Sequence, residues 1–258
     1  MDLHIDGRRA LVTGGSRGIG FGIARLLAAE GCRLELAARS AENLAAARKA
    51  LLAQDAGLQV GVHALDLSVP ANCAALSRAC ADIDILVNNA GAIPQADLGG
   101  MDDAAWRAAW ELKLYGFINL TREVYRGMCA RRRGVIVNVV GIAGERAIPN
   151  YLAGSMANAA LMAMTRALGA DAMQHGVRVV GINPGSTETD RQIVRWKARA
   201  KDKFGDEGRW RELTAGFPQG RLATVDEVAA TAVFLCSDRS SYTNATIVTI
   251  DGGWTSAH

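Results

Sequence analysis

The strongest constraint on the fold of this chain is an alternation of short apolar runs with alanine-rich segments of helical period. No repeat or low-complexity linker interrupts the alternation. Strands are expected near residues 8–13, 33–37, 59–64, 84–87, 135–139, 177–182 and 246–250. Helices are expected to begin near Gly18, Ala41, Val69, Asp102, Tyr151 and Val225. The alternation predicts one α/β domain over residues 1–258, a doubly wound parallel sheet between two layers of helices.

Composition narrows the functional classes. Half of the 258 residues are apolar, yet no charge-poor stretch is long enough to cross a bilayer, and no leader with a cleavage site is recognisable. The formal charge of +3 is small and its basic residues are mostly scattered, which argues against nucleic-acid binding. We therefore expect a cytoplasmic protein with a small-molecule substrate and neither a nucleic-acid nor a membrane partner.

Cysteine and histidine spacing predicts neither disulfides nor a metal site. The five cysteines form no CxxC pair and leave an odd one over, so reduced thiols, mostly in the core, are expected. The four histidines are far apart in the sequence and near no evident ligand cluster. These residues are Cys32, Cys73, Cys80, Cys129 and Cys236, and His4, His63, His175 and His258.

A glycine pattern follows the first expected strand. The segment RRALVTGGSRGIG places Gly14, Gly18 and Gly20 between that strand and the first helix. Glycines let the backbone approach a pyrophosphate, and the helix N-terminus offers free N–H groups and the positive end of its dipole. The pattern predicts a dinucleotide site, although a tight turn without a ligand would give the same glycines.

Further motifs resemble the classical short-chain dehydrogenase/reductase (SDR) family over nearly the whole chain. They are Asp66-Leu67 after the third strand, NNAG at 88–91, NPG at 183–185, Thr189, and DGG at 251–253. The resemblance implies a Rossmann-type fold and a homotetramer or homodimer, with helices over 106–131 and 151–175 and the C-terminal strand at the interfaces. The expected cofactor-binding residues are Gly14, Ser16, Arg17, Gly18, Ile19, Gly20, Arg39, Asp66, Leu67, Asn89, Ala90, Gly91, Pro184, Gly185, Thr187 and Thr189.

Charge at the end of the second strand indicates the cofactor. Sites that prefer NAD usually place an acid there for the ribose 2′-hydroxyl, whereas a 2′-phosphate favours arginine. Here Ala38 stands at the acid position, Arg39 follows, and Arg17 lies in the glycine loop. Arginine binds phosphate bidentately, so NADP(H) is predicted as preferred, with NAD(H) still possible. The alternative is that both arginines are ordinary surface residues.

The catalytic positions depart from the family pattern. Hydride transfer at a carbonyl carbon creates alkoxide character on oxygen, so a proton donor and fixed hydrogen bonds are needed there. The family uses Asn, Ser, Tyr and Lys, and its Lys lowers the pKa of its Tyr. Aligning the motifs places Lys113, Gly141, Gly154 and Asn158, respectively, at these positions. The usual mechanism therefore does not carry over to this chain.

An exchange of residue types suggests a rebuilt catalytic group. Lysine stands at the asparagine position and asparagine at the lysine position, and residues 151, 154, 155 and 158 share one helix face. We predict that Lys113 and Tyr151 form an acid/base pair and that Ser155 and Asn158 donate hydrogen bonds to the substrate oxygen. Gly154 would leave room for a substrate group. Alternatively, Tyr151 and Ser155 pack structurally and Lys113 points to solvent.

Residues 190–216 break the alternation and are expected to form a substrate lid. The stretch 190–211 holds eight Lys or Arg residues and fewer acids, which favours an anionic substrate. A solvated helix anchored by tryptophans would look the same. The chain is thus predicted to be an atypical SDR, an NADP(H)-dependent oxidoreductase acting on a hydroxyl or carbonyl compound. A non-redox lyase, hydratase or isomerase on this fold, or a silent NADPH-binding protein, remains the alternative.

Overall fold

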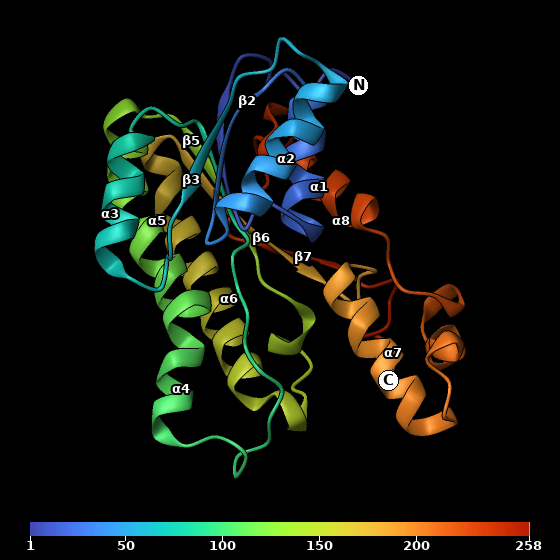
Figure 1. Cartoon of the computed structure of the whole chain (residues 1–258). Coiled ribbons are helices and arrows are strands. Elements are labelled where there is room, and N and C mark those ends of the chain that lie inside the picture. The colour runs from blue at the N-terminus through green and yellow to red at the C-terminus, as the bar shows by residue number, and fades with distance from the viewer. Residues whose placement is uncertain (258) are drawn as a thin grey trace.

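Seven parallel strands form the central sheet of the computed structural model, which describes residues 1–257 and leaves His258 outside (Figure 1). The strand order is β3-β2-β1-β4-β5-β6-β7. The strands are β1 (Arg9–Thr13), β2 (Arg33–Ala38), β3 (Val60–Ala64), β4 (Ile85–Asn88), β5 (Gly134–Val139), β6 (Val177–Pro184) and β7 (Ile247–Ile250). Every predicted strand is present, and the predicted Rossmann-type fold is confirmed.

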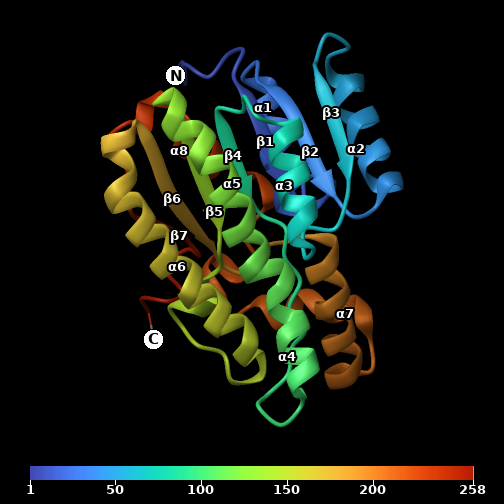
Figure 2. The same ribbon diagram turned by 90° about the vertical axis from the view of Figure 1, so that its left-hand side faces the viewer.

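Helices cover both faces of this sheet, with α3, α5 and α6 on one face (Figure 2) and α1, α2 and α8 on the other. The helices are α1 (Gly18–Ala29), α2 (Ala41–Gln54), α3 (Pro70–Ala79), α4 (Asp103–Trp110), α5 (Gly116–Arg131), α6 (Leu152–Ala172), α7 (Asp190–Phe204) and α8 (Val225–Cys236). Between α4 and α5 the chain makes a π-helical turn, Glu111–Tyr115, which the sequence pattern did not predict. No helix of residues 1–257 is long and apolar enough to span a membrane.

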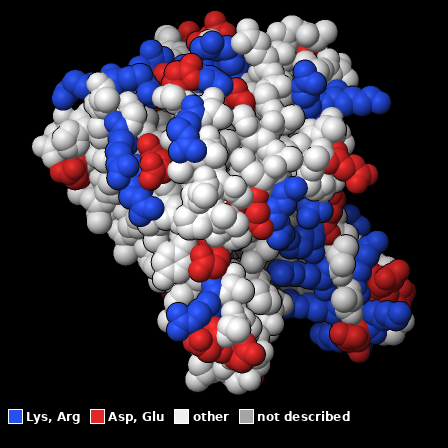
Figure 3. Space-filling model, turned by 60° about the vertical axis from the view of Figure 1, so that its left-hand side comes forward, with Lys and Arg blue, Asp and Glu red and all other residues white. Residues whose placement is uncertain are grey.

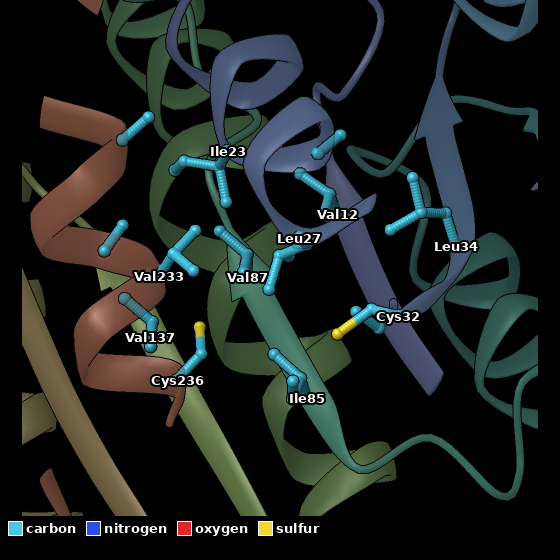
Figure 4. Close-up of a cluster of buried hydrophobic side chains, with 14 of the residues drawn as sticks. Val12, Ile23, Leu27, Cys32, Leu34, Ile85, Val87, Val137, Val233 and Cys236 are labelled. Carbon is cyan, nitrogen blue, oxygen red and sulfur yellow. The ribbon is translucent and has the colours of Figure 1, made fainter. Parts of the chain in front are cut away.

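Apolar side chains fill the space between each helical layer and the sheet. Figure 4 shows the core under α1 and α8, where Ile23 and Leu27 meet Val233 and the strand residues Val12 and Val87. All five cysteines are free thiols, four of them buried, as predicted. Burial raises the pKa of both the Cys32 and the Cys236 thiol to about 12. These thiols therefore serve as small apolar core residues.

One histidine is less isolated than its spacing suggested. His63 Nε2 lies 2.7 Å from Glu35 Oε2 and 3.6 Å from Cys80 Sγ, because β2 and β3 are neighbouring strands and α3 ends beside them. The prediction that no histidine lies near potential ligands is therefore wrong for His63. However, Arg9 Nη2 donates to Glu35 Oε1 at 2.6 Å. This guanidinium already neutralises the carboxylate and disfavours a metal ion there.

The strand order reverses direction between β1 and β4, and this places the candidate site. In doubly wound sheets, ligands bind beyond the carboxyl ends of the strands at this switch point. Residues 190–216 form α7 and a 3₁₀ segment, Glu207–Thr214, which extend beyond that end of the sheet (Figure 1). The expected lid region therefore lies next to the switch point.

Candidate active site

A cavity of about 870 Å³ opens at the carboxyl ends of the strands, between the sheet and α7. All of the predicted cofactor-binding residues except Gly20 and Asp66 line it. Those lining residues are Gly14, Ser16, Arg17, Gly18, Ile19, Arg39, Leu67, Asn89, Ala90, Gly91, Pro184, Gly185, Thr187 and Thr189. Apart from DGG at 251–253, every sequence motif thus contributes residues to one cavity.

The glycine turn before α1 is shaped to receive an anion. Gly14 and Gly18 have φ angles of +63° and +58°, which side-chain-bearing residues rarely adopt. A Cβ on Gly14 would come 2.8 Å from Asn89 Nδ2, so only glycine allows this close approach. No side chain caps the N-terminus of α1, whose first residues Gly18 and Ile19 face the cavity. These free N–H groups fit the pyrophosphate of a dinucleotide.

Thr13 fixes the opposite wall of the turn. Its Oγ1 accepts hydrogen bonds from Asn89 N at 2.9 Å and Ala90 N at 3.0 Å, while Asn89 Nδ2 donates to Thr13 O at 3.0 Å. Gly20 lies behind this contact, because a Cβ there would overlap Asn89 Nδ2 and Gly14 O. Gly20 therefore supports the cofactor loop by close packing without lining the cavity.

The end of β2 carries the groups expected near an adenine ribose. Arg17 and Arg39 line the cavity, and within residues 1–257 neither forms an ion pair with an acid. Ser40 and Asn43 line it too and were not predicted, although Ser40 directly follows Arg39 and Asn43 lies four residues after it. Asp66 Oδ1 accepts from Ser68 N at 2.9 Å, a bond that lowers the pKa of Asp66. The donors at the cavity, Arg17 and Arg39 with Ser40 and Asn43 beside them, fit a 2′-phosphate.

Replacing Arg39 by Ala should raise the Kd for NADPH by about tenfold or more and leave the Kd for NADH nearly unchanged. The reason is that a hydrogen bond to a charged group contributes roughly 1.5–3 kcal/mol. Calorimetric titration with both nucleotides measures the effect. Lys49→Ala is the matched control, since Lys49 is exposed on α2 outside the cavity. Equal weakening of both nucleotides would contradict a 2′-phosphate contact.

Lys113 lies in the π-helical turn and is buried at the cavity wall, with 8% of its surface exposed. Its Nζ donates to Val139 O at 2.8 Å and to Val140 O at 3.1 Å, at the end of β5. Burial, with a smaller effect of the Arg191 charge, lowers the pKa of Lys113 to about 7. Lys113 is therefore not a solvent-directed lysine, and its proton is exchangeable near neutral pH.

Tyr151 occupies the space that a side chain at position 154 would need. A Cβ built on Gly154 would overlap the ring carbons of Tyr151, and Tyr151 lines the cavity. The expectation that a substrate group fills this space is therefore wrong, because the phenol ring from one turn earlier already does. Burial raises the pKa of Tyr151, and the charges of Arg195 and Arg191 oppose that rise.

Ser155 and Asn158 lie behind the cavity lining. Ser155 Oγ accepts a hydrogen bond from Ile148 N at 3.1 Å, which anchors the loop before α6. Asn158 is buried, and its Oδ1 has no hydrogen-bond partner within residues 1–257. A Cβ on Gly141 would lie 3.1 Å from Asn158 Nδ2, so this amide packs against the glycine. The structure thus brings Lys113 and Tyr151 to the cavity wall but not Ser155 or Asn158.

Substitution of Gly154 by Ala should lower turnover about 100-fold while the protein stays folded. In most helices this change is favourable by up to about 1 kcal/mol, but here the added methyl group displaces the Tyr151 ring. A misplacement of about 1 Å costs this much in rate. The measurements are kcat and the thermal midpoint. Gly99→Ala is the control, because its nearest neighbour, Asp97 Oδ1, is 3.9 Å away; a fully active Gly154→Ala protein would contradict the prediction.

Only part of the basic segment 190–211, within the expected substrate lid, faces the cavity. Arg191 and Arg195 line it together with Asp190, Gln192 and Val194. Other lid cations are engaged elsewhere, with Arg199 over the Trp196 ring, Arg209 paired with Glu212, and Arg211 paired with Glu188. Figure 3 shows Lys and Arg side chains concentrated over the α7 region, at lower right, with others spread over the rest of this view. At the cavity this segment therefore presents two arginines and one carboxylate, Asp190.

Comparisons of the sequence and of the structure with known proteins identify oxidoreductases that match nearly the whole chain. A profile of the family described as enoyl-(acyl carrier protein) reductase matches residues 14–255. The chain is 35% identical over 254 residues to galactitol 2-dehydrogenase (L-tagatose-forming) of Cereibacter sphaeroides, covering 98% of this chain and 96% of that protein. It is 32% identical to 3-oxoacyl-(acyl-carrier-protein) reductase FabG of Chlamydia trachomatis, covering 95% and 96%. The solved L-sorbose reductase of Gluconobacter frateurii, complexed with NADPH and L-sorbose, superposes with a TM-score of 0.93 at 31% identity, covering all of both chains.

Proposed function

Because this chain belongs to the short-chain dehydrogenase/reductase family, whose members are NAD(P)-dependent oxidoreductases of hydroxyl and carbonyl compounds, we propose that it is an NADP(H)-dependent member with an atypical catalytic group. The observation that carries the proposal is the Tyr151 ring over Gly154, at the wall of the cofactor cavity. This ring restores a phenol from a different position of the chain. The NADP(H) preference is supported by Arg39 after β2 and Arg17 in the glycine loop, both of which line the cavity.

The side chains that line the cavity support a separate role for the cofactor and for each titratable residue. When bound, the nicotinamide supplies or accepts the hydride at the substrate carbon. Tyr151 donates its phenolic proton to the substrate oxygen in reduction and takes it back in oxidation. A phenol whose pKa is raised by burial is protonated at neutral pH, which suits the donating role.

Lys113 can replenish that proton. The neutral amine has two N–H groups and one lone pair. Two donors are directed to Val139 O and Val140 O, so the lone pair remains to accept a proton or, once protonated, a third N–H remains to donate one. With a pKa of about 7, both forms are populated near neutral pH. We assign Lys113, which lines the same cavity as Tyr151, the role of proton reservoir, and Ser155 and Asn158 supporting roles in the helix.

The substrate is proposed to be a small hydroxyl or carbonyl compound. The names of the similar proteins give galactitol, L-sorbose and 3-oxoacyl-(acyl-carrier-protein) as their substrates. These proteins share a class of substrate, hydroxyl and carbonyl compounds, but not one particular substrate. Within residues 190–216, an anionic substrate group would meet Arg191 and Arg195, the two cations of this segment that line the cavity. The homotetramer or homodimer expected from the resemblance stays a prediction, for which light scattering is the test.

A substrate screen that follows NADPH absorbance tests the proposal. Ketoses, polyols with NADP⁺, and 3-oxoacyl thioesters should be offered to the purified protein. A substrate-dependent change in absorbance supports an oxidoreductase. Product formation without any absorbance change would indicate a lyase, hydratase or isomerase. Tight NADPH binding without turnover of any compound would favour a silent binding protein.

A further inference from the structure

A nearby cation favours the phenolate form of a tyrosine, and the residue aligned with the family's usual lysine is Asn158. This amide carries no charge and lies behind the cavity lining. On the side of α4, Tyr151 packs against an apolar cluster that includes Ile93, Trp106 and Trp110. These contacts offer no charge to the phenolate. Any cation that stabilises the Tyr151 phenolate therefore lies on another wall of the cavity.

The charged residues that line the cavity are few. They are Arg17, Arg39, Lys113, Asp190, Arg191 and Arg195. Arg17 and Arg39 belong to the adenine end. Lys113 directs its ammonium group toward two carbonyl oxygens at the end of β5, and burial keeps it largely neutral above pH 7. The remaining cations are those of α7.

Arg191 and Arg195 are one helical turn apart on α7, so both face the cavity from the same side. Arg191 Nη1 donates to Gly91 O at 3.3 Å, which ties α7 to the floor of the cavity. Arg195 makes one weak contact, from Nη1 to Gln192 Oε1 at 3.5 Å. Within residues 1–257, no acid pairs with either guanidinium. Both positive charges are thus available to a group in the cavity.

We infer that Arg195, with Arg191 beside it, takes the place of the family's lysine as the cation that stabilises the phenolate of Tyr151. The charges of both arginines already oppose the rise in the Tyr151 pKa that burial causes, Arg195 more than Arg191. When the Tyr151 O–H bond breaks, the proton passes to the substrate oxygen and the negative charge stays on the phenolate. Arg195 stays protonated throughout and is a positioning residue. This inference rests on the proposed role of Tyr151.

The test is a spectroscopic pH titration of Tyr151 in the protein saturated with NADP⁺. Tyrosinate absorbance is recorded for the wild type, Arg195→Gln, Arg195→Lys and Arg199→Gln, and the curve of each protein carrying Tyr151→Phe is subtracted. Arg195→Gln should raise the Tyr151 pKa by about one pH unit, and Arg195→Lys should restore most of the shift. Arg199→Gln is the matched control, because Arg199 lies on the same helix over the Trp196 ring, outside the cavity.

Cofactor and substrate affinities separate the competing roles of Arg195. Unchanged NADPH affinity together with the shifted titration supports the inference. An unmoved Tyr151 titration overturns it, and the accompanying change identifies the real role: a weakened NADPH affinity would assign Arg195 to a cofactor phosphate, and a raised KM confined to anionic substrates would assign it to the substrate. The titration needs no turnover, so its outcome is independent of whether Tyr151→Phe abolishes activity.

Discussion

Tyr151→Phe is expected to lower kcat by about 10²–10⁴-fold while NADPH binds as in the wild type, because proton transfer by a positioned side chain contributes a factor of this size. The ring itself is retained, so its packing over Gly154 is preserved and only the hydroxyl group is lost. Steady-state kinetics on the substrate found in the screen, together with calorimetry of NADPH binding, measure the two quantities.

The control for this substitution is Tyr242→Phe, since Tyr242 is 97% exposed and outside the cavity. It should be as active as the wild type. If Tyr151→Phe were also fully active, the proton donor would have to be another group, and Lys113 would be the remaining titratable candidate near the end of β5. A loss of NADPH binding in Tyr151→Phe would instead point to a cofactor contact.

Lys113→Met should lower turnover about 100-fold and change how stability depends on pH. The pKa of Lys113 is lowered to about 7 in the folded protein and is about 10.4 in an unfolded chain. Below pH 7 both states hold the proton, so stability does not vary with it. Between these values only the unfolded state holds the proton, so raising the pH favours folding by about 1.4 kcal/mol per pH unit.

The free energy of unfolding of the wild type, relative to Lys113→Met, should therefore increase by roughly 2–3 kcal/mol from pH 7 to pH 9. Urea unfolding of both proteins at several pH values measures this difference. Lys49→Met, an exposed lysine of α2, should follow the wild-type curve. Parallel curves for wild type and Lys113→Met would mean that Lys113 keeps an ordinary pKa, and the proton-reservoir role would fail with it.

The sequence was informative where function depends on local backbone geometry. Gly14 and Gly18 adopt positive φ angles at the turn where a cofactor loop was expected, and Asn89 packs against that turn. Such positions can be recognised because glycine has a specific conformational freedom and because the turn links adjacent elements. Asp66 is different, since its carboxylate accepts from Ser68 N and lies outside the cavity lining.

The sequence predicted less about which residues at the start of α6 reach the cavity. Gly154, Ser155 and Asn158 lie within α6, whereas Tyr151, expected on the same helix face, is the N-cap residue that precedes it. The face that these residues form meets both the cavity and the interior. Periodicity identifies the shared face without separating these two environments. The sequence suggested that lysine and asparagine exchange places at positions 113 and 158 relative to the family. The carbonyl partners of Lys113, in contrast, depend on a π-helical turn that no sequence pattern predicted.

The sequence by itself determined the succession of strands and helices along the chain and the position of the glycine turn, because these follow from apolar periodicity and from the conformational freedom of glycine. It also predicted cofactor-binding segments, most of whose residues line one cavity. Only the tertiary structure decided that the Tyr151 ring fills the space above Gly154, that Ser155 holds a loop, and that Arg191 and Arg195 are the lid cations facing the cavity. These outcomes depend on how α6 and α7 pack against the end of the sheet, which brings together residues far apart in the chain.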